Sequence, residues 1–296
     1  MKYDKLTKFG FLLIILSLNL SLKGQSELFS SELEIKVHQA LYSFHFDEAK
    51  WMQNNIDIEQ PTIAIILKTQ ELWWETISSD GSFIAVNNAI NNYHKQCIET
   101  TQNIENLYFA ALEMRISATS KHYYTAFKNW RIITNELKNY PLEQKDTVSL
   151  FIHGITNCTK GELQRKIPFL VRDSYTFQEN MTKGVEMLQC CCKSTNSIIN
   201  SESHYYLMRY YSDILNEYDK SLQHSSYLIN TFPDNYIFRY YHILNLMETG
   251  AYEIALETIN TGIQDSYNQE SYSEIQRNYY SQLMRILLET NKDYFN

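Results

Sequence analysis

Apolar residues recur at helical spacing along most of this chain, with polar residues between them. In the first such segment, Leu33, Val37, Ala40 and Leu41 follow the spacing of three to four residues that is typical of an amphipathic helix. The same periodicity predicts helices or helical pairs over residues 28–58, 61–101, 104–140, 203–216, 219–231, 235–248, 252–263 and 272–290. Between residues 146 and 200 the pattern is less regular, and we expect one enlarged pair with a break at Lys160-Gly161 and an insertion around 165–175.

A second pattern lies on top of this periodicity, in which an aromatic residue stands three positions before a small one. Its clearest examples are Phe46 with Ala49, Tyr123 with Ala126, Tyr218 with Ser221, and Tyr252 with Ala255. A small side chain lets the second helix of a pair approach the first closely, and the aromatic ring fills the space that opens toward the next pair. The last two small residues are 34 positions apart, and that period is typical of helical repeats.

The aromatic-to-small spacing and the 34-residue period resemble those of tetratricopeptide repeat (TPR) proteins. The low content of glycine (8) and proline (4) and the high content of tyrosine (23) make the chain similar to the degenerate, exported TPR proteins of Bacteroidota. The resemblance implies an all-α fold, a right-handed α-solenoid of about six to seven antiparallel helix pairs. Such a solenoid has a concave groove, lined by the first helix of each pair, that holds a protein or peptide.

The resemblance also implies which residues line the groove. The register set by Ser221 and Ala255 places six side chains on its concave side, namely Tyr206, Tyr210, Tyr240, Arg115, His38 and Tyr42. A tyrosine offers both contact area and a directional hydroxyl group, which suits an extended peptide or a glycan. The alternative is that these tyrosines are packing residues. We expect Trp73 and Trp74 to lie in the core, because tryptophan is mostly buried in folded proteins.

The N-terminus predicts export. Three lysines precede an apolar stretch of about 14 residues that ends at Lys23-Gly24, and this is the pattern of a secretory signal peptide. The stretch is shorter than the roughly 20 residues of a spanning helix, although an uncleaved anchor remains the alternative. We therefore divide the chain into a signal peptide, 1–24, and one helical repeat domain, 25–296. The mature protein is expected in the periplasm or outside the cell, without stable membrane insertion.

The charge balance narrows the choice of partner. The chain has 26 basic and 34 acidic residues, a net charge of −8. An acidic surface repels phosphate groups, which argues against a nucleic-acid partner. A protein or peptide partner remains the leading prediction.

Candidate chemistry in the sequence is sparse. The eight histidines are scattered singly, and the five cysteines form no CxxC pair, so we predict no metal site and no cofactor. Cysteine burial is the leading interpretation, and one disulfide involving Cys158 is the alternative. An enzyme that uses Cys158 or the Cys190–Cys192 cluster is the least favoured function. The sequence predicts a non-enzymatic protein-binding or scaffolding module, with a glycan-capture protein of a nutrient-uptake system as the alternative.

Overall fold

The computed structural model describes residues 28–29, 31–59, 61–79, 81–97, 104–139, 147–169, 176–270 and 272–291. The predicted signal peptide, residues 1–24, lies outside these ranges. Thirteen α-helices, and no β-strand, occur in the described part of the chain, so the all-α prediction is confirmed.

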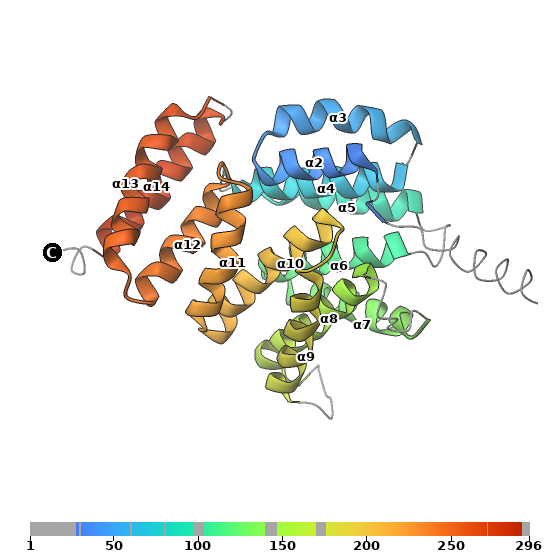
Figure 1. Cartoon of the computed structure of the whole chain (residues 1–296). Helices are drawn as coiled ribbons and strands as arrows, with labels where there is room; N and C mark the ends of the chain where they lie inside the picture. Colours follow the sequence, from blue (N-terminus) through green and yellow to red (C-terminus); the bar gives the residue numbers. More distant parts are fainter. Residues whose placement is uncertain are drawn as a thin grey trace, which may run out of the picture.

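Consecutive helices pack side by side in pairs (Figure 1). The helices are α2 (Glu32–Tyr42), α3 (Phe46–Glu59), α4 (Pro61–Ile77), α5 (Ile84–Cys97), α6 (Ile104–Thr119), α7 (Tyr123–Glu136), α8 (Thr147–Lys166), α9 (Phe177–Cys191), α10 (Ser197–Tyr210), α11 (Tyr218–Thr231), α12 (Tyr236–Glu248), α13 (Tyr252–Asn268) and α14 (Glu274–Thr290). A 3-10 turn (Leu137–Asn139) follows α7, and a π-helical turn (Tyr211–Leu215) follows α10.

Local sequence explains where several helices begin. Ser31, Thr176 and Ser273 each form a capping box with the Glu or Gln three residues later. Asn196 and Asn235 each accept two backbone N–H groups of the helix that follows. These side chains satisfy amide groups that a helix leaves unpaired in its first turn.

The turns before the aromatic residues share one geometry. The residue two positions before each aromatic has a positive φ, at Phe44, Lys121, Asn216 and Gly250. In three of these turns the next backbone N–H reaches back to a carbonyl five residues earlier, as in His45 N to Ala40 O at 2.9 Å. This pairing closes the first helix and reverses the chain. Each second helix then starts at its aromatic residue: α3, α7, α11 and α13.

The small residues of the pattern lie where the two helices of a pair approach each other. Ala49, Ala126, Ser221 and Ala255 are all 0% exposed. Ser221 also donates its hydroxyl to the carbonyl of Met208 on the preceding helix, at 2.8 Å. A serine therefore replaces alanine there without leaving a buried polar group unpaired.

The middle of the chain is more regular than expected. The predicted break at Lys160-Gly161 is wrong, because α8 runs without interruption from Thr147 to Lys166. A glycine costs a helix about 1 kcal/mol, but Gly161 packs against Met181 of α9. The two helices also lie close together at Gly184, where an added Cβ would lie 2.4 Å from the sulfur of Cys158. Close packing of α8 against α9 thus outweighs the low helix propensity of glycine.

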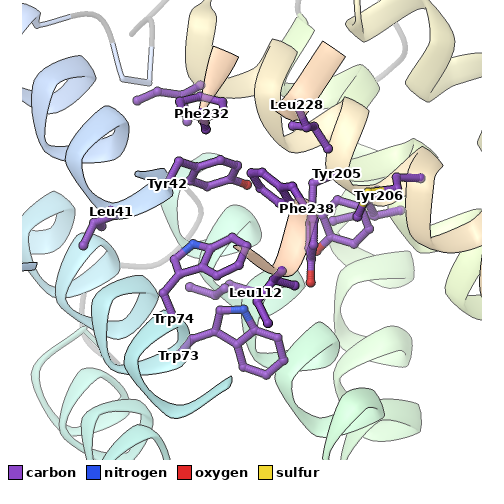
Figure 2. Packing of buried hydrophobic residues seen from close by; sticks show 14 of the residues in the cluster. Leu41, Tyr42, Trp73, Trp74, Leu112, Tyr205, Tyr206, Leu228, Phe232 and Phe238 are labelled. Atoms are coloured by element: carbon purple, nitrogen blue, oxygen red, sulfur yellow. The ribbon is translucent and has the colours of Figure 1, made fainter. Parts of the chain in front are cut away.

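Helices far apart in the sequence also pack together. The rings of Tyr42 in α2, Trp74 in α4 and Phe238 in α12 gather in one buried cluster (Figure 2), with centroids 5.0 to 5.7 Å apart. Tyr205 of α10 joins it, 5.4 Å from Trp74. Trp73 and Trp74 are fully buried, as predicted. Contacts are therefore not confined to neighbouring pairs, as they are in an idealised repeat array.

Hydrogen bonds also connect the N-terminal helices α2 and α4 to the start of α12. Asn235 donates to the carbonyl of Tyr42 at 2.8 Å, and the Tyr236 hydroxyl donates to the carbonyl of Ser78. His45 lies 3.0 Å from the carboxylate of Asp234. The start of α12 is thus attached to the ends of α2 and α4. Among the described helices, none combines the length and apolar character needed to cross a membrane.

The close helix contact at Ala255 gives a first prediction. Ala255→Leu adds bulk at a position with no free space, and overpacking of this kind costs about 1–3 kcal/mol of unfolding free energy. Ala85→Leu makes the same change at an exposed position of α5 and should leave stability nearly unchanged. Chemical denaturation of the two variants checks this; equal stability would contradict the packing role of Ala255.

Candidate functional site

A cavity of about 250 Å³ lies between α6, α8 and α10. Its wall includes four tyrosines and several charged residues. The lining comprises Met114, Arg115, Ala118, Thr119, Lys121, Tyr123, Thr159, Glu162, Arg165, Lys166, Tyr205, Tyr206, Arg209, Tyr210, Asp213 and Ile214. The volume is slightly below the roughly 300–1,000 Å³ of pockets for drug-sized ligands. It suits one side chain or the end of a chain better than a long ligand.

Arg115 forms the charged inner wall of this cavity. Its Nη1 donates to Glu202 Oε2 at 2.9 Å, and both side chains are buried. Gln70 of α4 donates to the other oxygen of Glu202 at 3.2 Å. The guanidinium also lies 5.4 Å from the ring centroids of Trp73 and Tyr206, so aromatic faces replace part of its hydration. This ion pair connects α6 to α10, and the hydrogen bond from Gln70 connects α4 to the same glutamate.

Arg209, in the last turn of α10, is a second charged group in the wall. Its Nε donates to Asp213 at 2.5 Å, and its Nη1 donates to the Tyr205 hydroxyl at 3.2 Å. The Tyr241 hydroxyl of α12 donates to the same Asp213 carboxylate at 3.2 Å. Asp213 lies in the π-helical turn that follows α10.

Glu162 is the remaining acidic side chain of the wall. Burial raises its pKa above the ordinary value, while the positive charges of Arg165, Arg209 and Lys166 act in the opposite direction.

Basic side chains outnumber acidic ones in the lining of the cavity. Five basic residues line the cavity (Arg115, Lys121, Arg165, Lys166 and Arg209) against two acidic ones (Glu162 and Asp213). Lys121, Arg165 and Lys166 are exposed, so their charges meet an incoming ligand first. In a chain with net charge −8, this is a local reversal of sign, and it favours an anionic group.

The structure separates the six residues predicted to line a groove. Arg115, Tyr206 and Tyr210 come together in the cavity wall. All three are largely buried, with 6–7% of their surface exposed. Tyr240 is half-buried on α12 beside Tyr241 and does not line the cavity.

His38 and Tyr42 lie in the core, and the prediction that they face an open groove is corrected here. His38 is 1% and Tyr42 0% exposed. Their rings contact each other, with centroids 4.1 Å apart. The rings of Phe232 and Phe238, from the C-terminal third of the chain, pack against Tyr42. The placement failed because sequence register alone does not reveal that α12 folds over α2.

Other residues of the site had no signal in the sequence that singled them out. Glu202 is 87 positions from Arg115, and Glu162, Arg165 and Lys166 belong to the segment whose helix was expected to break. The helical periodicity of residues 147–166 continues through Gly161. Following it would have placed Glu162, Arg165 and Lys166 on one helix.

The candidate nucleophile of the sequence is sealed. Cys158 is fully buried, and burial raises the pKa of its thiol well above the usual value. Its sulfur faces Gly184. Cys158, Cys190, Cys191 and Cys192 are all free thiols, so no disulfide involving Cys158 forms among the described cysteines. A protonated, inaccessible thiol is a poor nucleophile.

Comparisons with protein-family models, with curated proteins and with solved structures gave no significant match to this chain. The TPR resemblance therefore rests on the chain's own pattern and on its paired helices.

The buried ion pair gives a second prediction. Glu202→Ala leaves the Arg115 charge buried without its partner, and we expect a loss of about 3–5 kcal/mol of unfolding free energy. Replacing both members, by Arg115→Met with Glu202→Leu, should restore most of that loss. Glu32→Ala breaks the exposed Glu32–Lys36 pair and should barely change the melting temperature. A double variant less stable than Glu202→Ala would contradict this account.

His38 gives a third prediction, on pH. Burial, with a smaller effect of the Arg115 charge, lowers the pKa of His38 from 6.5 to about 3. The unfolded chain therefore binds a proton below pH 6.5 that the folded chain does not, and stability falls as the pH drops from 6.5 toward 3. The fall from this group approaches about 1.4 kcal/mol per pH unit.

His38→Leu tests this linkage, because leucine has a similar volume and cannot titrate. Denaturation curves between pH 7 and pH 5 should show a shallower loss of stability in the variant than in the unaltered protein. Neither ring nitrogen of His38 has a hydrogen-bond partner among the described residues, so the variant should lose little stability at pH 7. Identical pH slopes would contradict the assignment.

Proposed function

We propose that this protein is a non-enzymatic binding module, a TPR-like right-handed α-solenoid that holds a segment of a partner protein. The bound segment places an acidic side chain or a C-terminal carboxylate in the cavity between α6, α8 and α10. The observation that carries the proposal is the excess of basic side chains around a tyrosine-lined cavity in an acidic chain.

Three features of the cavity support a carboxylate-bearing ligand. Arg165 and Lys166 are exposed at its edge, where they can meet an anion without prior desolvation. Arg115 and Arg209 lie deeper and are held by Glu202 and Asp213. Their positions are therefore fixed before the ligand arrives, which reduces the entropy lost on binding. The tyrosine rings supply apolar contact beside the charges.

The paired helices and the repeated turn geometry support the TPR-like part of the proposal. Four second helices begin at an aromatic residue and bury a small residue three positions later. Export to the periplasm or beyond the cell is proposed from the signal-like sequence of residues 1–24 alone. The sealed Cys158 thiol supports a binding role over thiol catalysis.

The fourth prediction tests the basic edge of the cavity. Arg165→Glu with Lys166→Glu reverses two exposed charges in the last turn of α8, so the fold should persist with a modest loss of stability, while binding of acidic peptides weakens at least ~10-fold. The control Lys193→Glu makes a similar reversal at an exposed lysine that does not line the cavity, and it should bind like the unaltered protein.

The probe is an array of peptides that differ only in a terminal carboxylate or amide and in Glu or Gln near the end, read by fluorescence binding. A preference for the carboxylate forms that disappears at high salt supports the proposal. Equal binding of Glu and Gln peptides would overturn it. On a parallel glycan array, binding of neutral glycans in place of peptides would favour the capture-protein alternative.

A further inference from the structure

Three consecutive helices bring a thiol and two imidazoles together away from the cavity. Cys192 follows the last residue of α9, His204 lies in the middle of α10, and His224 lies on α11. The potential ligand atoms of the three side chains all lie within 4.8 Å of one another. The two Nδ1 atoms of the histidines are 3.0 Å apart, so one donates a hydrogen bond to the other.

From this geometry we propose a site for a divalent d-block cation, with Zn²⁺ as the best fit, bound by Cys192, His204 and His224. Zinc accepts mixed sulfur and nitrogen ligands in a tetrahedron, with Zn–N of about 2.0–2.1 Å and Zn–S of about 2.3 Å. Such a tetrahedron separates two nitrogens by roughly 3.3 Å and a nitrogen from sulfur by roughly 3.5 Å. Small side-chain rotations would bring the three groups to those separations.

The imidazoles are held in place by aromatic stacking. His204 stacks on Tyr227, with centroids 3.8 Å apart and an interplanar angle of 15°. His224 stacks on Tyr211, with an interplanar angle of 9°. Stacking fixes the ring planes before a metal arrives, which is the role that outer-shell partners have in known metal sites.

A hydrogen-bond chain joins the thiol end of the site to the histidine end. Asn200 donates to the carbonyl of Cys192 at 2.6 Å. The same Asn200 accepts from the Tyr227 hydroxyl at 2.7 Å, and Tyr227 is the ring under His204. One asparagine therefore sets the position of Cys192 relative to the imidazole.

The accessibility and the ligand types of the site also suit metal binding. All three ligand residues are half-buried, which leaves a path for an ion and for one solvent molecule as a fourth ligand. The set of one sulfur and two nitrogens favours zinc over magnesium or calcium, which prefer oxygen ligands.

The fifth prediction is that the full chain, with its cysteines reduced, binds one Zn²⁺ per molecule in equilibrium dialysis and melts at a higher temperature with Zn²⁺ than without. Titration with Co²⁺ should give a thiolate-to-metal charge-transfer band and the visible bands of a tetrahedral site. Cys192→Ser and His204→Gln should each weaken Zn²⁺ binding by at least ~10-fold, since each removes a ligand.

Cys190→Ser is the matched control, because Cys190 is exposed and only two residues away; it should bind Zn²⁺ normally. Loss of binding in this control would assign the metal to a surface thiol and overturn the proposal. The absence of a Co²⁺–thiolate band from the unaltered protein would overturn it as well, whether or not the variants fold. Unchanged Zn²⁺ affinity in both ligand variants would also overturn the proposal.

Discussion

The contact between Arg115 and Glu202 is the constraint that organises the centre of this protein. A buried charge is costly unless it is paired, so once Arg115 is inside, α6, α10 and α4 must keep Glu202 and Gln70 beside it. Aromatic rings of Trp73, Tyr205 and Tyr206 surround the guanidinium. The same arginine forms the inner wall of the cavity, so the interaction that holds the helices together also determines the electrostatics of the candidate binding site.

The proposed peptide site and the proposed zinc site use α10 in different ways. The residues that face α6 and α8, among them Tyr206 and Arg209, line the cavity. His204 faces His224 of α11 instead. Both sites depend on the same helix being placed correctly, and its N-cap Asn196 also donates to the carbonyl of Leu28 at 2.9 Å. The position of α10 is thus fixed from the N-terminal end of the described chain.

Sequence predicts the local features of this structure well and the long-range ones poorly. The helical segments and the close packing of the small residues Ala49, Ala126, Ser221 and Ala255 could be predicted, because helical periodicity and the pairing of neighbouring helices act over a few residues. The break expected at Gly161 was wrong because packing against α9 outweighs helix propensity. Of the six residues predicted to line a groove, Arg115, Tyr206 and Tyr210 line the candidate cavity. Glu202 beside that cavity, and Cys192 and His204 of the proposed zinc site, carry no spacing that marks their partners. Those partners lie on other helices, and only the tertiary structure brings them together.

The attachment of α12 to the ends of α2 and α4 bears on the order in which the chain can fold. In an array where each repeat touches only its neighbours, folding can start anywhere and spread. Here Tyr42 and Trp74 can pack against Phe238 only after the ribosome has synthesised α12. Contacts between residues so far apart in the sequence slow folding, because a large loop must close before they form. Until α12 packs against them, the N-terminal helices expose the aromatic rings of Tyr42 and Trp74 to solvent. A chain shortened before residue 235 would keep that surface open permanently, which makes the C-terminal third a cover for the N-terminal core as well as a continuation of the helix series.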